Sequence, residues 1–267
     1  MLKVGFYQFR PLFGQIEKNL KKVVQTLHTA SADLIVLPEL AFTGYYFQNR
    51  DEVKNLAEDP KNSSTVERLI ALCKDHDFYL VTGFAEKKRD KYFNSALLLG
   101  PEGLIHTYRK LHLFNEEKNW FDPGDTPLSL QEVRGAKLGI MICFDWIFPE
   151  VTRTLAIQGA DIICHPSNLV MSYCQSAMLT RCLENGIYSI TANRFGADKR
   201  PHGELRFTGK SQIVAPKGEL LHRVASQREA LFITEIDPDL ARDKHITALN
   251  QLIADRRPEF YHPLTRL

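Results

Sequence analysis

Three reactive side chains each accompany an apolar, strand-like run of the chain: the carboxylate of Glu39, the ammonium of Lys110 and the thiol of Cys143. The runs are DLIVLP before Glu39, LIHTYR before Lys110, and KLGIMIC, which ends at Cys143. Ligands of open α/β sheets bind at the carboxyl ends of strands, so we expect these side chains to meet. Together they could act as nucleophile, proton-transfer base and oxyanion stabiliser. Each alone is more simply a packing or loop residue, and only their joint occurrence indicates a catalytic site.

The elements that would carry these residues alternate between strands and helices in the first half. The strand KVGFYQF precedes a helix near residues 15–31, and DLIVLP precedes a helix near residues 65–76, where Ser64 and Glu67 have the spacing of a capping box. The strand FYLVTGF follows, and this β-α-β-α-β series predicts a mostly parallel sheet covered by helices. SALLLG and LIHTYR then form a hairpin, because Pro101-Glu102-Gly103 between them has the residues of a turn.

The second half repeats the plan of the first. KVG at residue 3 recurs as KLG at residue 137, and ADLI at residue 32 recurs as ADII at residue 160. The hairpin with PEG at residue 101 is matched by SQIVAPKGELLHRV, with PKG at residue 216. Such a period is too long for a solenoid and indicates a two-fold duplication. We therefore expect an α/β fold in which two internally duplicated β-sheets form one four-layer αββα sandwich, with residues 1–267 as a single domain.

The three reactive residues lie in the contexts LPELAFTGY, YRKLHLF and ICFDWIFPE. This set resembles the nitrilase, or carbon-nitrogen hydrolase, superfamily, and HPSNLV, RCLENGIYSITANR and DRRPEFY extend the resemblance over essentially the whole chain. The resemblance implies a Glu39-Lys110-Cys143 triad. It also implies a second glutamate between the lysine and the cysteine. In NEEKNWFDPGD that position falls on Glu117, with the adjacent Glu116 as the alternative.

Amide hydrolysis needs a strong nucleophile and a movable proton, because an amide is a poor electrophile and its amine leaves badly. We expect Cys143 to attack while Glu39 takes the thiol proton and returns it to the departing nitrogen, leaving a thioester that water then cleaves. Lys110 and the backbone N–H of Phe144 would stabilise the oxyanion. The resemblance implies that Glu117 holds the substrate amide and positions Lys110. No metal ion or organic cofactor is required by this chemistry.

The substrate is expected to be a small amide, cleaved to a carboxylic acid and ammonia or an amine. True nitrilases of this family tend to have Trp-Glu after the cysteine, whereas this chain has Phe144-Asp145. A nitrilase and an N-carbamoyl amine hydrolase remain as alternatives, as does an acyl-transferring or non-catalytic member of the family. Phe144, Trp146 and Tyr45 are candidate substrate-binding residues, although aromatic residues at the ends of elements usually pack.

Composition excludes several other classes of protein. The 34 basic residues nearly balance the 32 acidic ones, so neither nucleic acid nor an anionic membrane is an expected partner. The five cysteines have no paired C-x-x-C spacing, which argues against a disulfide framework and a zinc site. The N-terminus lacks the apolar region of a signal peptide. We therefore expect a cytoplasmic protein without a membrane-spanning segment.

Two segments indicate self-association. The stretch MSYCQSAMLTRCLENG predicts a helix with a stripe of mostly small residues at Tyr173, Ala177, Met178, Cys182 and Gly186. The C-terminal DRRPEFYHPLTRL is rich in charge and proline, yet it carries apolar side chains that need a surface to cover them. By resemblance, family members pair through helices near the nucleophile strand and send this tail to the partner. We expect a homodimer or a higher homo-oligomer.

Overall fold

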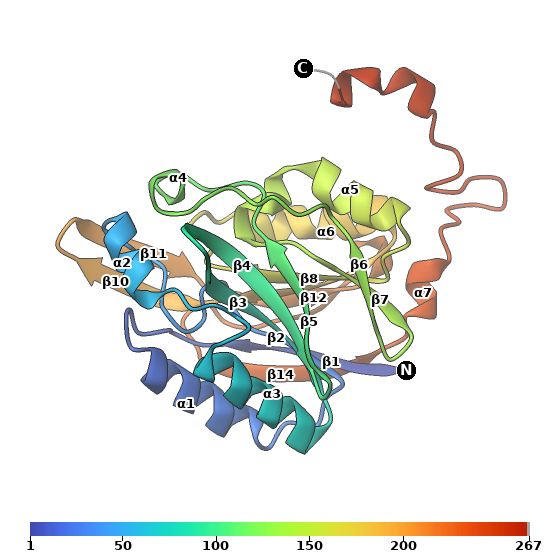
Figure 1. The fold of residues 1–267 in the computed structure, drawn as a ribbon. Helices are drawn as coiled ribbons and strands as arrows, with labels where there is room; N and C mark the ends of the chain where they lie inside the picture. The colour runs from blue at the N-terminus through green and yellow to red at the C-terminus, as the bar shows by residue number, and fades with distance from the viewer. Residues whose placement is uncertain (266–267) are drawn as a thin grey trace.

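The computed structural model describes residues 1–265. Two six-stranded sheets lie back to back at the centre of the molecule (Figure 1). The first has the order β14 (Ala230–Ile236), β1 (Leu2–Gln8), β2 (Leu34–Val36), β3 (Tyr79–Lys88), β4 (Lys91–Gly100) and β5 (Gly103–Arg109). The second has the order β13 (Leu220–Arg223), β12 (Gln212–Val214), β9 (Tyr188–Asn193), β8 (Ile162–Ser167), β7 (Ala136–Ile140) and β6 (Leu130–Val133).

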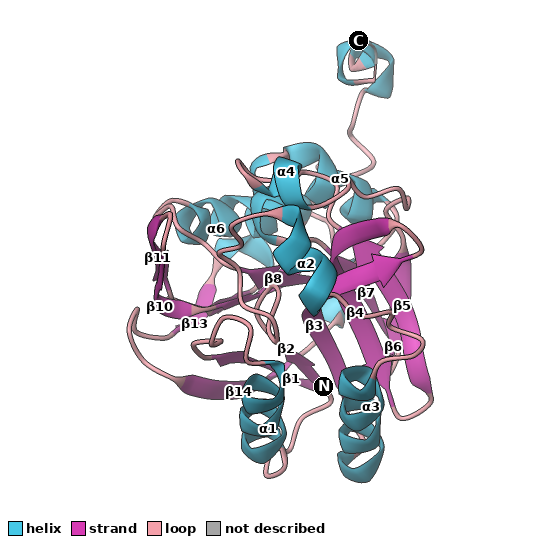
Figure 2. Ribbon diagram, turned by 60° about the vertical axis from the view of Figure 1, so that its left-hand side comes forward, coloured by secondary structure: helices cyan, strands magenta, loops and turns pink. Residues whose placement is uncertain are grey.

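Helices cover the outer face of each sheet and complete the four-layer sandwich (Figures 1 and 2). Helices α1 (Ile16–Leu27) and α3 (Ser64–His76) pack beside the first sheet, and α5 (Pro149–Ile157) and α6 (Cys174–Asn185) pack beside the second. Strands β1, β2 and β3 contact β8 and β9 across the middle layer. The short central strands β2 and β8 are buried along their whole length, as expected where parallel strands are covered on both faces.

The predicted duplication is confirmed by matching backbone contacts in the two halves. Strand β1 pairs in parallel with β2, and β2 with β3, just as β7 pairs with β8 and β8 with β9. Asp33 accepts a hydrogen bond from the Lys3 N–H at 2.7 Å, and Asp161 accepts one from the Lys137 N–H at 2.9 Å. Both hairpins predicted at the PEG and PKG turns also form, as β4–β5 and β12–β13.

Several local predictions need correction. The capping box at Ser64 is wrong, because Ser63 caps α3 by accepting the Val66 N–H at 3.1 Å. The Ser63 hydroxyl also donates to Glu58 at 2.6 Å, which fixes the cap one residue earlier. The first helix ends at Leu27, before residue 31. The structure adds elements that the sequence pattern did not reveal: α2 (Arg50–Leu56), α4 (Glu117–Trp120), α7 (Asp239–Arg242) and a separate hairpin of β10 (Phe195–Arg200) and β11 (Gly203–Thr208).

The stripe expected on α6 is divided between buried and exposed residues, since Tyr173 remains 56% exposed. Met178, Cys182 and Gly186 are buried within their own chain, because this face of α6 packs on the second sheet. Beyond α7, the chain runs along and then away from the body, ending in 3-10 turns at Pro258–Phe260 and His262–Leu264 (Figure 1). Among residues 1–265, no helix is both long enough and apolar enough to cross a membrane.

Strand β3 approaches the segment after β2 so closely that only glycine fits at position 83. A Cβ added to Gly83 would lie 2.3 Å from the Cα of Glu39 and 2.4 Å from the N of Leu40. The Gly83 N–H donates to the carbonyl of Pro38 at 3.1 Å, and its carbonyl accepts from the N–H of Ala41 at 3.3 Å. Gly83 therefore sets the position of the Glu39 backbone.

We predict that Gly83→Ala lowers both stability and activity, because the added methyl group must displace the backbone that carries Glu39. The expected loss in the free energy of unfolding is about 1–3 kcal/mol, as for other overpacked sites. Gly14→Ala is the control, since a Cβ there meets no atom within 4 Å and costs only the strain of a positive φ of 68°. Urea unfolding and turnover rates test this, and a fully active Gly83→Ala protein would contradict it.

Candidate active site

The three reactive residues each lie just beyond a strand. Glu39 is in the loop after β2, Lys110 directly follows β5, and Cys143 begins the 3-10 helix η1 (Cys143–Ile147) after β7. Cys143 was expected to close its strand, but β7 ends at Ile140. Its φ of 41° lies in the left-handed region, which non-glycine residues adopt at a cost. The sharp turn thus places the thiol off the line of the strand.

The site is organised around the buried ammonium of Lys110. Its Nζ is 2.6 Å from Oε1 of Glu39 and 2.8 Å from both carboxylate oxygens of Glu117. Asn94 Nδ2 donates to the same Oε1 of Glu39 at 2.7 Å, and the Tyr45 hydroxyl donates to Oε1 of Glu117 at 2.5 Å. All five side chains are buried. The second oxygen of Glu39, Oε2, is buried without a hydrogen-bond partner among residues 1–265, which leaves it free to accept a proton.

The pattern of charge shifts the acid–base properties of this cluster. Burial raises the pKa of the Glu39 carboxyl, and the nearby Glu117 adds to the rise, while Lys110 and the Asn94 donor oppose it. Burial and the Glu39 charge raise the pKa of the Cys143 thiol well above its usual value, against the field of Lys110. Burial alone would lower the pKa of Lys110, but the charges of Glu117 and Glu39 outweigh it and raise that pKa. Lys110 is therefore a permanent cation, and Glu39 is a stronger base than an exposed carboxylate.

The nucleophile turn is held by Asp145, the third residue of η1. Its carboxylate accepts the Ile142 N–H at 3.0 Å, the His112 N–H at 3.1 Å and the Tyr108 hydroxyl at 2.7 Å. Asp145 is fully buried. Ile142 directly precedes Cys143, whereas Tyr108 and His112 lie two residues before and two residues after Lys110. Asp145 thus ties the turn of the thiol to the segment of the lysine.

A buried histidine fixes the carbonyl of the nucleophile. His165 lies on β8 between the Cys143 carbonyl, 3.0 Å from Nε2, and the Thr191 hydroxyl, 3.1 Å from Nδ1. Because a carbonyl can only accept, Nε2 is the donor and Nδ1 accepts from the hydroxyl. Burial lowers the pKa of His165 to about 4, so the ring is neutral near pH 7. We regard His165 as a positioning residue.

Cys143 lines a small cavity with about 20 Å³ of free space. Such a volume holds roughly one water-sized group. Phe144 and Trp146, both expected near the substrate, line it. Tyr45 does not line it and instead holds Glu117. Phe144 also lines a wider hollow of about 440 Å³, whose other walls are Leu111, His112, Leu113, Lys118, Pro123 and Phe148.

The two neighbouring glutamates, Glu116 and Glu117, differ in burial. Glu117 is the first residue of α4 and joins the buried ion cluster, whereas the side chain of Glu116 is exposed. Gly124, in the Pro-Gly pair that follows, donates its N–H to the carbonyl of Lys110 at 2.9 Å. A Cβ at Gly124 would lie 2.3 Å from the carbonyl oxygen of Arg109, so this close return of the chain also requires glycine.

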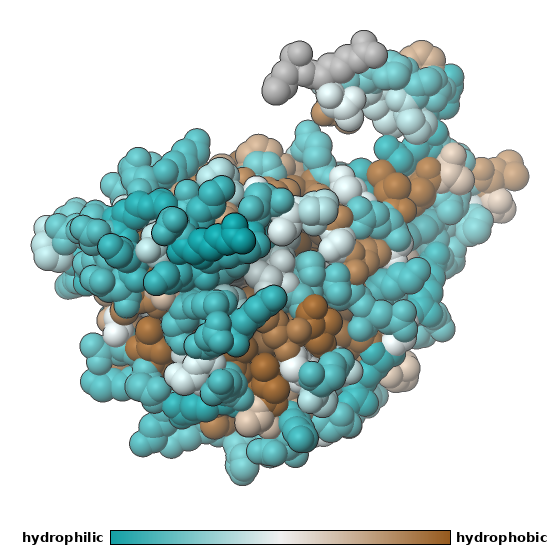
Figure 3. Space-filling model, viewed as in Figure 1, coloured by the Kyte–Doolittle hydropathy of each residue, from teal (hydrophilic) through white to brown (hydrophobic). Residues whose placement is uncertain are grey.

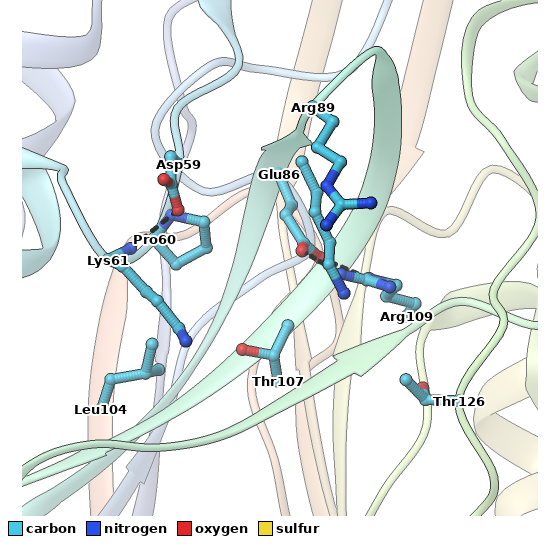
Figure 4. A pocket seen from close by; sticks show the side chains of 10 residues that line it. Asp59, Pro60, Lys61, Glu86, Arg89, Leu104, Thr107, Arg109 and Thr126 are labelled. Atoms are coloured by element: carbon cyan, nitrogen blue, oxygen red, sulfur yellow. Dashed lines mark hydrogen bonds and ion pairs between the residues drawn. The ribbon is translucent and has the colours of Figure 1, made fainter.

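A second buried ion pair anchors the strands that carry the site. Arg109 Nε donates to Glu86 at 2.9 Å, and the Ser95 hydroxyl donates to the same carboxylate at 2.6 Å. Ser95 and Arg109 are opposite each other in the pairing of β4 with β5. Ser95 directly follows Asn94, and Arg109 directly precedes Lys110. Figure 4 shows Glu86 and Arg109 together in the wall of a separate hollow of about 410 Å³, which Cys143 does not line. This pair restrains the ends of β4 and β5.

Sequence reasoning missed four polar residues of the site: Asn94, Asp145, His165 and Asn168. Asn168 Nδ2 donates to the carbonyl of Glu39 at 2.8 Å, and the backbone of Asn168 lowers the pKa of the Cys143 thiol slightly, against the larger effect of burial. The available signal was the presence of polar residues within or just after apolar strands, as in ICHPSN.

Comparison with known proteins gives consistent matches over the whole chain. The family model described as carbon-nitrogen hydrolase matches residues 3–245. A nitrilase from Pyrococcus abyssi is 44% identical over 264 residues, covering 98% of this chain and 99% of that protein. An (R)-stereoselective amidase from Pseudomonas sp is 31% identical over 243 residues, covering 89% of this chain and 86% of that protein. The crystal structure of a carbon-nitrogen hydrolase from Helicobacter pylori G27 superposes with a TM-score of 0.90 at 25% identity, covering 99% of this chain and 98% of that one.

The hydrogen bond from Asn94 to Glu39 predicts a specific pH effect. Because this donor lowers the pKa of Glu39, Asn94→Leu should raise that pKa further. We expect Glu39 to accept the thiol proton in its ionised form, so the acidic limb of the kcat/KM profile should move to higher pH by about one unit. Asn55→Leu, at an exposed position of α2, is the control and should not move it. An Asn94→Leu enzyme with an unshifted acidic limb would show that Asn94 does not tune the base.

Proposed function

Because this chain belongs to the carbon-nitrogen hydrolase family, we propose that it hydrolyses a small amide through a thioester on Cys143. The chain is a carbon-nitrogen hydrolase, and the proposal concerns the substrate and the roles of the residues. One observation supports it: a buried carboxylate with a raised pKa, and with an oxygen unpartnered among residues 1–265, lies near enough to a buried thiol to raise the thiol pKa, beside a lysine fixed between two carboxylates.

In the first step, the Cys143 sulfur forms a bond to the amide carbon as its proton passes to Oε2 of Glu39. The carbonyl π electrons move to oxygen, and the resulting negative charge is stabilised by Lys110 and by the backbone N–H of Phe144. Fixed donors of this kind contribute about 10²–10³ in rate. The raised pKa of the thiol keeps it protonated until attack, so proton transfer and bond formation are coupled.

In the next steps, Glu39 gives the proton to the substrate nitrogen, the carbon–nitrogen bond breaks, and ammonia or an amine leaves. A water molecule then attacks the thioester while Glu39 takes one of its protons. The carbon–sulfur bond breaks, the sulfur regains a proton from Glu39, and the carboxylic acid is released. Glu117 keeps Lys110 in place and, held by Tyr45, supplies a second carboxylate to the substrate amide.

The size of the cavity that Cys143 lines supports a small acyl group. Phe144-Asp145 after the nucleophile favours amide hydrolysis, while the relative named nitrilase supports the conversion of a nitrile to acid and ammonia as the second candidate. An N-carbamoyl amine substrate and acyl transfer to an acceptor other than water use the same first steps. Ammonia release from matched aliphatic amides, N-carbamoyl amines and nitriles distinguishes these candidates, and release from nitriles alone would contradict the amidase proposal.

We predict that intact-mass spectrometry with a turned-over amide shows one acyl adduct, located on Cys143. Cys143→Ala should lose the adduct and lower turnover by at least about 10³, because no other group can replace the thiolate. Cys182→Ala is the matched control, since Cys182 is buried on α6 and bonded to Ser189 away from the cavity. An adduct on Cys164 or Cys174, or full activity in Cys143→Ala, would contradict the assignment.

We further propose that the chain forms a homodimer or a higher homo-oligomer, in which residues 1–267 act as one catalytic domain. Apolar side chains are exposed beside the nucleophile segment at Tyr173 (56%) and Leu183 (47%), and on the tail at Phe260 (65%) and Leu264 (66%). Figure 3 shows the tail standing off the body, and among residues 1–265 little covers the exposed apolar side chains of the tail. A partner subunit would cover them.

Light scattering should therefore give twice the chain mass of 30.6 kDa or a larger multiple of it. Deletion of residues 258–267 should weaken the dimer, because it removes the apolar side chains of the tail. Leu12→Ser, at an exposed position in the first half, is the control and should not change the mass. A stable, active monomer of the full chain would refute the proposal.

A reducing compartment suits this chemistry. Among residues 1–265 all five cysteines are buried and free, and the proposed nucleophile must remain a thiol. We therefore propose a cytoplasmic location.

A further inference from the structure

Asn168 stands at the junction of the two groups that exchange the thiol proton. It directly follows β8 and is 2% exposed. Its Nδ2 donates to the carbonyl of Glu39 at 2.8 Å. It also lines the cavity that Cys143 lines. Asn168 therefore borders the same small cavity as Cys143 and touches the backbone of Glu39.

The orientation of its side-chain amide is fixed. The carbonyl of Glu39 can only accept a hydrogen bond, so the NH₂ group of Asn168 must point toward it. The carbonyl oxygen, Oδ1, consequently points elsewhere, and it is buried without a hydrogen-bond partner within residues 1–265. A buried acceptor that lacks a donor is unfavourable, and such groups in native proteins have a reason.

The surroundings of Glu39 contain an excess of acceptors. Oε2 of Glu39 and Oδ1 of Asn94 are also buried and unpartnered in the described part of the chain. The only cation of the cluster, Lys110, already donates to Glu39 and Glu117. A ligand suited to this site must therefore bring donors of its own.

We propose that Asn168 Oδ1 accepts a hydrogen bond from the N–H of a substrate carboxamide, and so selects primary amides over nitriles. The inference rests on the proposed amide hydrolysis and names the group that recognises the substrate nitrogen. A primary amide brings two N–H donors, whereas a nitrile nitrogen can only accept and would leave Oδ1 unpaired. With one N–H held by Asn168, Oε2 of Glu39 stays open for the thiol proton. The scissile nitrogen is then oriented before attack.

The test compares the binding of propionamide and propionitrile, which share a carbon skeleton and differ at the nitrogen. Ligand-observed NMR titrations in the Cys143→Ala background separate binding from turnover. Adding Asn168→Leu should weaken propionamide about tenfold, the usual effect of one net hydrogen bond, and change propionitrile by less than about twofold. Equal weakening of both probes would show that Asn168 only supports the loop of Glu39, and would overturn the proposal.

Two further variants keep the test decisive. Asn185 is a matched control, because it is also buried with an unpartnered Oδ1 but lies on α6 and does not line the cavity. Asn185→Leu should leave the ratio of the two affinities unchanged. Asn168→Asp keeps an oxygen acceptor but loses the donor to Glu39, so it should retain the preference for propionamide even if Asn168→Leu fails to fold. Loss of that preference in Asn168→Asp would contradict a role for the acceptor.

Failure of this inference differs from failure of the proposed function. If the wild-type enzyme releases ammonia from propionamide but Asn168→Leu leaves the affinity ratio unchanged, only the role of Asn168 is wrong. If propionamide neither binds nor is hydrolysed while propionitrile is hydrolysed, the amidase proposal and the role of Asn168 both fail.

Discussion

The structure depends on a buried ion cluster in which the ammonium of Lys110 lies between the carboxylates of Glu39 and Glu117. Lys110, Glu39 and Glu117 are all buried, and charges removed from water are unfavourable unless each is closely paired and hydrogen-bonded. Here the pairing comes from segments far apart in the sequence, so the cluster exists only when the first sheet and the loop that contains α4 are both in place. Burial opposes ionisation of Glu39 and therefore favours its uptake of a proton. The nearby negative charge of Glu117 adds to this effect, so Glu39 is more basic than an exposed carboxylate.

Close backbone approaches make this arrangement rigid. Gly83 and Gly124 allow β3 and the loop after α4 to touch the backbones of Glu39 and of Arg109-Lys110, where any Cβ would collide. On the other side, Asp145 gathers backbone and side-chain donors around the turn of Cys143. The reacting groups are thus positioned by main-chain contacts, which restrict their geometry more tightly than mobile side chains would.

The sequence allowed prediction of features that depend on local pattern or on repeated pattern. The strands, the two hairpins, the duplicated sheets and the residues Glu39, Lys110 and Cys143 follow from apolar runs with polar residues at their ends. The cap of α3 was misplaced by one residue, because neighbouring serines offer the same hydroxyl and a distant Glu58 decides between them. The contacts of Asn94, His165 and Asn168 were missed, since their partners lie in distant segments and the sequence alone does not show that proximity. The β10–β11 hairpin was missed because its strands, FGADKR and GELRFT, lack a clear apolar alternation.

The duplication has a consequence for how the site is assembled. The loops after β2 and β8 occupy equivalent places in the two halves. The first loop carries the carboxylate of Glu39, and the second carries the amide of Asn168. The two loops meet where the Asn168 side chain donates a hydrogen bond to the carbonyl of Glu39. Glu39 and Lys110 come from the first half, whereas Cys143 and Asn168 come from the second. Neither half contains a complete set of reacting groups. These residues can therefore meet only where the two halves pack together, so the equivalent loops of the two copies can differ in chemistry.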